Sequence, residues 1–194
     1  MTGHSIPGVE ITDRGPYTGT WLRGRFYPLD PRPEEVKIED IAAGLSKQCR
    51  FNGHIDRFYS VAEHSVIAST LTTDIHLARW LLMHDAPEAY IGDMVRPLKA
   101  VIPQFQAIED RIMTVIAEKF GLDGEMPDEV KVIDNVMCST EKRDLIPGSP
   151  PWANMPPALL TMEITEREVL PEEARLMFMR RFHELFDRNG NRTS

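Results

Sequence analysis

Residues 81–93 read Leu-Leu-Met-His-Asp-Ala-Pro-Glu-Ala-Tyr-Ile-Gly-Asp, an apolar approach that ends in a cluster of proton-accepting side chains. Successive helical residues point about 100° apart, so His84 and Asp85 can meet at one point only in a cleft between helices. Glu88 follows His84 by four residues and returns to nearly the same face. A buried imidazole beside a buried carboxylate is unfavourable unless each is paired or bound to a cation. The stretch therefore indicates a metal ion or a strong hydrogen-bond network.

The flanking segments have the apolar periodicity of helices. Ser60 and Glu63 have the form of a capping box, in which the serine accepts from the amide of residue 63 and the glutamate reaches back. Pro87 prevents a regular helix from continuing through the quoted stretch. We expect one helix from Ile38 that ends before Cys49, one opened by Ser60, one capped by Thr73 or Asp74, one from Pro103 to Gly121, one from Pro127 and one over 171–187.

The two ends of the chain differ from this helical centre. Tyr17 to Tyr27 is typical of a short hairpin with its turn near Gly24, and residues 147–157 hold five prolines in eleven positions, which predicts a surface loop. The inward apolar stripes of the helices include Leu71, Ile75 and Leu176. We predict one domain over 1–194, an all-α helical bundle with a small β-hairpin in an N-terminal extension (1–33), a core (38–143), the loop 147–157 and the last helix 171–187.

Composition restricts the class of function. The formal net charge of −8 over 194 residues makes the chain a poor candidate for binding a nucleic-acid polymer. Two cysteines, Cys49 and Cys138, give neither a disulfide framework nor a closely spaced metal-binding pair, which fits a reducing compartment. No apolar run approaches membrane-spanning length, and Met1 to Glu10 lack the basic and hydrophobic regions of a leader. We expect a cytoplasmic protein that does not bind membranes.

Three of the expected helices each offer metal-competent side chains at inward positions. These are His64, then His84 with Asp85, then an aspartate of the helix that starts at Pro127. Asp128, Asp134 and Asp144 all lie in or beside that helix, and the inward phase of Asp134 favours it. Two imidazoles and two carboxylates suit a divalent ion such as Mn, Fe, Co or Zn, and leave positions open for water or phosphate oxygens.

The order of these groups resembles a known family. Ser-Val-Ala-Glu-His-Ser (60–65), Met-His-Asp-Ala-Pro-Glu (83–88), Gly-Asp (92–93), Pro-Leu-Lys (97–99) and Ile-Asp-Asn-Val-Met-Cys (133–138) are similar to the H…HD…D pattern of HD-domain metal-dependent phosphohydrolases. Within that family they most resemble the small branch of bacterial 5′-deoxynucleotidases and phage dATP triphosphohydrolases. The resemblance covers residues 38–143 and implies an HD-domain fold.

The resemblance also implies roles for individual residues. The metal ligands would be His64, His84, Asp85 and Asp134, and Glu88 and Asp93 would be the catalytic acids beside the attacked phosphorus. Substrate would be bound by Arg50, Phe51, Pro97, Lys99 and His54. Phe51 stands where the branch usually carries tryptophan, so it keeps a flat apolar surface but lacks an indole N–H. His54 has two interpretations, nucleotide binding or a hydrogen bond that orients the Arg50 loop.

These residues define the expected function. We expect a dNTP triphosphohydrolase, with dATP as the named substrate, that releases deoxynucleoside and triphosphate. The alternatives are a 5′-deoxynucleotidase that acts on dNMPs and a nucleotide-sensing module that lacks turnover. We expect a divalent transition metal (Co, Mn, Zn or Fe) as cofactor, Mg entering with a triphosphate, and a homo-oligomer, as is usual in this branch.

Overall fold

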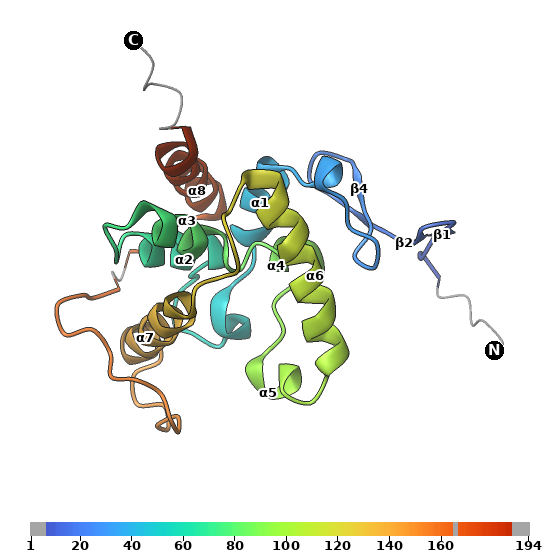
Figure 1. Ribbon diagram of the computed structural model, residues 1–194. Coiled ribbons are helices and arrows are strands. Elements are labelled where there is room, and N and C mark those ends of the chain that lie inside the picture. The colour runs from blue at the N-terminus through green and yellow to red at the C-terminus, as the bar shows by residue number, and fades with distance from the viewer. Residues whose placement is uncertain (1–6, 165–166, 188–194) are drawn as a thin grey trace, which may run out of the picture.

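The computed structural model describes residues 7–164 and 167–187, so both ends of the predicted domain (1–6 and 188–194) lie outside the described part (Figure 1). The helices are α1 (Ile38–Leu45), α2 (Val61–Ser69), α3 (Ile75–Met83), α4 (Glu88–Ile91), α5 (Arg96–Lys99), α6 (Pro103–Phe120), α7 (Asp128–Leu145) and α8 (Pro171–Phe186), with 3-10 turns η1 (Pro33–Glu35) and η2 (Arg50–Gly53). The strands are β1 (Ile11–Thr12), β2 (Gly15–Pro16), β3 (Thr18–Gly19) and β4 (Arg25–Phe26). The predicted mostly helical class is confirmed.

Helix α2 is the centre of the bundle. It contacts α1, α3, α7 and α8, and seven of its nine residues are buried. Alanine and serine make much of its surface, which lets the neighbouring helices approach on several sides. A helix surrounded in this way holds any polar residue at its centre away from water. His64 lies on this helix and is fully buried.

The predicted caps set where the central helices begin. The Ser60 hydroxyl accepts from the Glu63 amide at the start of α2, and the Asp74 carboxylate accepts from the amides of His76 and Leu77 at the start of α3. The second bond of the predicted capping box, in which the Glu63 carboxylate reaches back to the start of the helix, is wrong. The Glu63 carboxylate instead lies 3.3 Å from the Arg57 guanidinium, because an ion pair satisfies a buried charge better than one amide does.

The predicted break after residue 83 is confirmed and positions the polar stretch. Helix α3 ends at Met83, a turn follows, and α4 begins at Glu88 directly after Pro87. Helix α4 packs against α1, where a Cβ added to Gly44 would lie 2.9 Å from the backbone of Ala89. The absence of a side chain at Gly44 therefore permits the close contact that holds α4, and Glu88 with it, in the interior.

The N-terminal region forms two hairpins that project from one side of the helical body (Figure 1). Strand β3 pairs antiparallel with β4 around a turn at Thr20–Gly24, which confirms the predicted hairpin. A second pair, β1 with β2, was not predicted. Its short segments have no alternating apolar pattern, and the Arg14 guanidinium ties them to Asp30 and Glu35.

Three predicted core positions are wrong. The side chains of Leu71, Ile75 and Leu176 are exposed. Helix α8 instead buries Ala174, Phe178, Phe182 and Leu185, because its contacts with α1, α2 and α3 fix a face that its mixed apolar pattern leaves open. The segment 147–157 has no helix or strand, which confirms the predicted loop. Across the described ranges, no helix is long and apolar enough to cross a membrane.

Candidate metal centre

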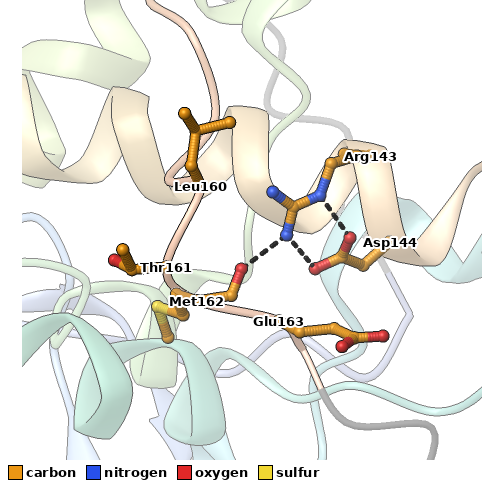
Figure 2. Close-up of a pocket in the computed structure, with 6 residues that line it drawn as sticks. All are labelled: Arg143, Asp144, Leu160, Thr161, Met162 and Glu163. Carbon is orange, nitrogen blue, oxygen red and sulfur yellow. Dashed lines mark hydrogen bonds and ion pairs between the residues drawn. The ribbon is translucent and has the colours of Figure 1, made fainter.

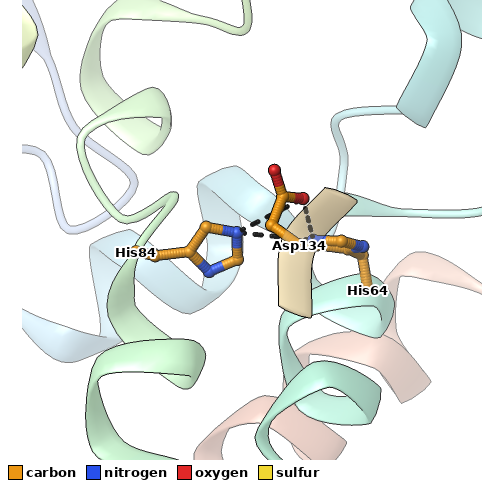
Figure 3. Close-up of side chains that lie close together, drawn as sticks. All are labelled: His64, His84 and Asp134. Atoms are coloured by element: carbon orange, nitrogen blue, oxygen red, sulfur yellow. Dashed lines mark hydrogen bonds and ion pairs between the residues drawn. The ribbon is translucent and has the colours of Figure 1, made fainter. Parts of the chain in front are cut away.

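His64 from α2, His84 from the end of α3 and Asp134 from α7 converge on one point (Figure 3). The two imidazole Nε2 atoms lie 3.4 Å apart. The Asp134 Oδ1 atom lies 3.3 Å from the His64 Nε2 and 3.9 Å from the His84 Nε2. One ligand atom from each of the three side chains is thus available to a single metal ion.

The hydrogen bonds of the two histidines involve their Nδ1 atoms and leave their Nε2 atoms for a metal ion. The His84 Nδ1 lies 2.8 Å from the carbonyl oxygen of Leu81, which can only accept, so this nitrogen carries the proton. The His64 Nδ1 contacts the Glu141 carboxylate in the same manner. In their neutral form both imidazoles therefore present the Nε2 lone pair to the common point, which is the arrangement found in histidines that bind metals.

The spacing of these atoms also fits a metal ion. Tetrahedral ligands at about 2.0–2.1 Å from a zinc-sized cation lie roughly 3.3 Å from each other. Two of the three separations in the group are 3.3 and 3.4 Å, and the third is 3.9 Å. Asp134 and the two histidines thus fit a divalent ion with little movement of the side chains.

Asp85 lies beside this group. Its Oδ1 is 3.2 Å from the His84 Nε2, and its Oδ2 is 3.8 Å from the His64 Nε2. Within the described residues, the Oδ2 atom is buried without a hydrogen-bond partner. The Arg50 guanidinium lies 3.6 Å from this oxygen, beyond hydrogen-bond distance, so a closer cation would stabilise it further. Asp85 thus lies beside the group of three and is available as the predicted fourth ligand.

Glu141 is a functional residue that the sequence analysis missed. It is fully buried on α7, and its carboxylate accepts hydrogen bonds from His64, from the Tyr59 hydroxyl at 3.0 Å and from the Arg50 guanidinium at 2.9 Å. It fixes the ring of His64 with its Nε2 toward the metal position. Its spacing could have indicated its place: Glu141 follows Asp134 by seven residues, so the two lie on the same helical face, two turns apart.

Arg50 inserts a cation among the carboxylates. Its side chain is 12% exposed, and besides Glu141 it lies 3.6 Å from Asp85 and 3.9 Å from Asp134. Its guanidinium therefore borders the metal group, as predicted for a phosphate-binding residue. In the described part of the chain, its Nε is buried without a partner and remains available to an acceptor.

The electrostatic field of the centre attracts positive charge. Burial lowers the pKa of His84, but the charges of Asp85 and Asp134 outweigh it and raise this pKa to about 9. Burial and the Arg50 charge lower the pKa of His64, yet Glu141 and Asp134 raise it above its ordinary value. Groups that favour a bound proton so strongly also favour a bound metal cation in its place.

Glu88 lies in the interior one turn beyond Asp85. Burial, followed by the charges of Asp85 and Asp93, raises its pKa well above the ordinary range, against the opposing charge of Lys99. Its Oε1 lies 3.3 Å from the Lys99 Nζ, and its Oε2 is buried without a partner among the described residues. The raised pKa favours the protonated form of this carboxyl group, and its Oε2 is the oxygen without a hydrogen-bond partner. Lys99 itself also donates to Glu109 at 2.8 Å.

Asp93 lines a separate hollow of about 370 Å³ with Gln48, Cys49, Asn52, Gly53 and Gly92. Gly92 has φ of 80° and ψ of 157°, a conformation that essentially only glycine adopts, so the turn before Asp93 depends on it. Asp93 is exposed, and so is Pro97 on α5. The structure thus places Asp93, a predicted catalytic acid, and Pro97, a predicted substrate-binding residue, at the surface, whereas the other predicted acid, Glu88, lies inside.

The turn that carries Arg50 is strained. Phe51 and Asn52 both have left-handed backbone conformations, with φ of 53° and 56°, which cost roughly 1–2 kcal/mol per residue for L-amino acids. The Phe51 ring lies 5.9 Å from the ring of Trp152 in the loop 147–157. His54 is exposed, and its backbone amide donates to the carbonyl oxygen of Phe51. Such strain at a non-glycine residue is found most often at functional sites.

Arg96 is a second residue that the sequence analysis did not assign. Its guanidinium donates to the Asp134 Oδ2 at 2.9 Å and to the Asn135 side-chain oxygen at 2.9 Å. It thus holds the outer oxygen of Asp134 and leaves the Oδ1 facing the two histidines. These two hydrogen bonds join α5 to α7, and they arise from tertiary packing of the two helices.

The hollow lined by Arg143, Asp144, Leu160, Thr161, Met162 and Glu163, of about 350 Å³, has a structural role (Figure 2). The Arg143 guanidinium donates to Asp144 and to the carbonyl oxygens of Leu159 and Met162. Asp144 also accepts from the Ile164 amide at 2.8 Å. These bonds tie the chain after the loop to α7. Asp144 is therefore occupied by these contacts, and Asp128 is exposed in the first turn of α7. Of the three candidate aspartates, only Asp134 lies with the two histidines.

Comparison with known proteins gives relatives without a described activity. No family model matches the chain. The chain is similar to the uncharacterized protein YfdR of Escherichia coli K12, with 40% identity over 86% of this chain and 93% of that protein. It is also similar to an uncharacterized protein of Rhodobacter capsulatus, with 34% identity over 81% of this chain and 89% of that protein.

Proposed function

This chain belongs to the family of the Escherichia coli protein YfdR, and we propose that it is an HD-domain, metal-dependent phosphohydrolase that acts on deoxynucleotides. One observation carries the proposal: the Nε2 atoms of His64 and His84 and the Oδ1 of Asp134 converge on one point. Both imidazoles are also oriented there by acceptors at their Nδ1 atoms. Because a structural helical bundle has no need for such a group in its interior, a bound cation explains it best.

The cofactor would be a divalent transition ion, with Co, Mn, Zn and Fe all compatible with mixed imidazole and carboxylate ligands. His64, His84, Asp85 and Asp134 would hold it. When bound, such an ion neutralises phosphate oxygens and lowers the pKa of water. Arg50 borders the same point and offers the planar fork that matches two oxygens of a phosphate.

Glu88 would supply the proton that the leaving group requires. Its raised pKa favours the protonated form, and Lys99 contacts its Oε1 while its Oε2 has no partner among the described residues. The Oε2 is therefore the atom from which a proton can pass to the 5′-oxygen of the departing deoxynucleoside. A module that only senses nucleotides needs no buried carboxyl group with a raised pKa, so Glu88 favours the enzyme over the sensing alternative.

We propose dATP as the first candidate substrate, with deoxyadenosine and triphosphate as products. The support is the resemblance of residues 60–65 and 83–88 to the branch that contains dATP triphosphohydrolases. A triphosphate brings strong negative charge to a centre whose cations already have carboxylate partners, so Mg²⁺ would enter with it.

The second candidate, removal of 5′-phosphate from a dNMP, is favoured by one observation. Lys99, which the resemblance assigns to substrate binding, is shared between Glu88 and Glu109. The positive charge left for the substrate is then mainly that of Arg50, and a monophosphate requires less positive charge than a triphosphate does. The two candidates differ in their products, which makes them simple to separate.

The test is an assay of the purified chain with Co²⁺ or Mn²⁺ against dNTPs, NTPs and dNMPs, with products separated by anion exchange. Triphosphate from dATP supports the first candidate, and inorganic phosphate from dNMPs supports the second. A matched pair of variants ties activity to the site: His84→Ala should abolish it, whereas His183→Ala, which breaks only the exposed pair with Asp187, should not. A protein that binds metal but hydrolyses no nucleotide in this panel would contradict the proposal.

A further inference from the structure

The loop 147–157 presents an exposed indole beside the metal centre. The Trp152 side chain is 43% exposed, whereas Trp80 in the core is 2% exposed. Its ring centroid lies 5.9 Å from that of Phe51, with the two planes tilted by 37°. An exposed indole offers a flat apolar face on which a planar ligand ring can stack.

The loop is fastened to groups that surround the centre. The Lys142 Nζ donates to the Ser149 carbonyl oxygen at 3.2 Å and lies 5.3 Å from the Trp152 ring centroid, a cation–π contact. On the other side, the Met155 sulfur lies 3.7 Å from the Arg96 guanidinium that holds Asp134. These contacts set the position of Trp152 relative to the metal ligands.

The groups follow one another in the order of the parts of a nucleotide. The Arg50 guanidinium lies 3.6 Å from Asp85 at the metal group, and its central carbon is 5.6 Å from the Phe51 ring centroid. The Trp152 ring is in turn 5.9 Å from the Phe51 ring, so Phe51 lies in contact with both Arg50 and Trp152. A phosphate bound at Arg50 would therefore carry its sugar past Phe51 and its base toward Trp152.

We propose that Trp152 binds the nucleobase of the substrate by stacking and so determines how tightly nucleotides bind. The proposal rests on the proposed function for the place of the phosphate. A planar ring inserted between two others needs about 7 Å, twice the spacing of stacked bases, and the rings of Phe51 and Trp152 are closer than that. The base therefore lies against the exposed indole face, and Phe51 borders the sugar.

Stacking predicts a specific kinetic effect. Loss of one base–aromatic contact weakens binding by roughly 5- to 150-fold. Trp152→Ala should therefore raise KM for the nucleotide by about this factor and leave kcat nearly unchanged, while Trp152→Phe keeps a stacking surface and stays within a few-fold of wild type. Trp21→Ala is the matched control, because Trp21 is 48% exposed on the N-terminal hairpin and contacts Arg175 of α8.

A binding measurement separates this inference from the proposed function. Deoxyadenosine is a product of both candidate reactions and cannot be hydrolysed, so it reports the base site without turnover. Titrated into wild type and Trp21→Phe with excitation at about 295 nm, it should quench indole emission. In Trp152→Phe the quenching should be lost, and 2-deoxyribose should have no effect on any of the proteins.

The outcomes are distinct. Quenching through Trp152 without hydrolysis of any nucleotide would support the base site and reject the proposed function. Hydrolysis of nucleotides with no quenching and an unchanged KM in Trp152→Ala would reject the base site alone. An equal rise in KM for 2-deoxyribose 5-phosphate, which has no base, would also overturn the proposal, because it would assign Trp152 a role in holding the loop.

Discussion

Helix α7 contributes to two clusters of arginine and carboxylate groups. In the first, its Asp134 lies with Arg50 and the histidines, and in the second, its Arg143 and Asp144 lie against the chain that follows the loop 147–157. At the second cluster every group is paired: Arg143 donates to Asp144 and to two carbonyl oxygens, and Asp144 also accepts from Ile164. At the first, among the described residues, the Asp85 Oδ2, Glu88 Oε2 and Arg50 Nε are buried without hydrogen-bond partners. Complete pairing holds a loop in place, whereas incomplete pairing in the interior provides binding capacity for a ligand.

The largest effect should come from removing a metal ligand. His84→Ala should lower metal content to background and activity by at least about 10⁴-fold, the scale seen when a member of an interdependent catalytic set is removed. Chelation of the wild type should have the same effect, reversed by Co²⁺ or Mn²⁺. Metal analysis and steady-state kinetics measure both.

Asp144→Asn is the control for that prediction, since it alters the fully paired carboxylate on the same helix. It should retain its metal and activity and lose about 1–2 kcal/mol of unfolding free energy, measured by urea denaturation. If Asp144→Asn lost metal as completely as His84→Ala, the contrast between the two clusters would be wrong.

The next effect concerns the proton held by Glu88. Glu88→Gln should reduce kcat by about 10²–10⁴-fold with full metal content, because an amide cannot donate the proton. Glu109→Gln is the matched control: it removes the other carboxylate that contacts Lys99 and should change kcat only a few-fold. An unchanged kcat in Glu88→Gln would reject the assigned role.

The raised pKa of Glu88 also fixes the sign of a pH effect. The folded protein binds this proton more tightly than the unfolded chain, so the contribution to stability is fully present below the pKa of an unfolded glutamate and is lost as pH rises through the raised folded value. Urea denaturation from pH 5 upward should show a decline in stability in wild type that is smaller in Glu88→Gln. Activity that needs the protonated form should fall over the same upper range.

These predictions involve some residues that the sequence indicated and others that only the structure identified. The contrast between the two sets shows which parts of the site could be predicted from the sequence. His64, His84 and Asp134 were selected because each lies at or near an inward position of a predicted helix and because together they match the H…HD…D pattern, and Pro87 marks the break beside them. Glu141 was missed because its neighbours Lys142, Arg143 and Asp144 are typical of a solvated helical face. Its burial depends on Tyr59 and Arg50, which are distant in sequence.

Trp152 and Arg96 were missed for the same reason. Neither lies in a periodic pattern, and their roles arise from contacts between the loop 147–157, α5 and α7. The error at Glu63 has a related cause: a local motif predicted a bond to the backbone, and a tertiary contact with Arg57 replaced it. Local patterns therefore located the three side chains that converge, whereas the contacts that orient them became evident only in the assembled fold.

An intermediate effect is expected at Glu141. Glu141→Gln should weaken metal binding by about 10- to 100-fold, the usual effect of altering the group that orients a ligand histidine. It also leaves Arg50 without its closest carboxylate, so we expect a lower melting temperature. Tyr59→Phe separates the two effects, because it removes one hydrogen bond to Glu141 and retains the carboxylate. Metal titration by calorimetry should find Tyr59→Phe much closer to wild type.

The smallest effect, and the most direct comparison of the two clusters, comes from their outer arginines. Arg96 holds Asp134 from an exposed position, with 54% of its side chain accessible, so Arg96→Gln should leave the free energy of unfolding nearly unchanged. It should lower metal affinity and activity by a few-fold up to about tenfold, since Asp134 then loses its fixed orientation. Arg143→Gln should do the opposite, with activity retained and about 1–2 kcal/mol of stability lost with the bonds to Asp144 and the loop. Arg96→Lys, which restores the charge but not the two-pronged contact with Asp134 and Asn135, should recover only part of the activity. If both glutamine variants changed stability and activity in parallel, the pairing of charges would not distinguish the cluster that binds a ligand from the one that holds the loop.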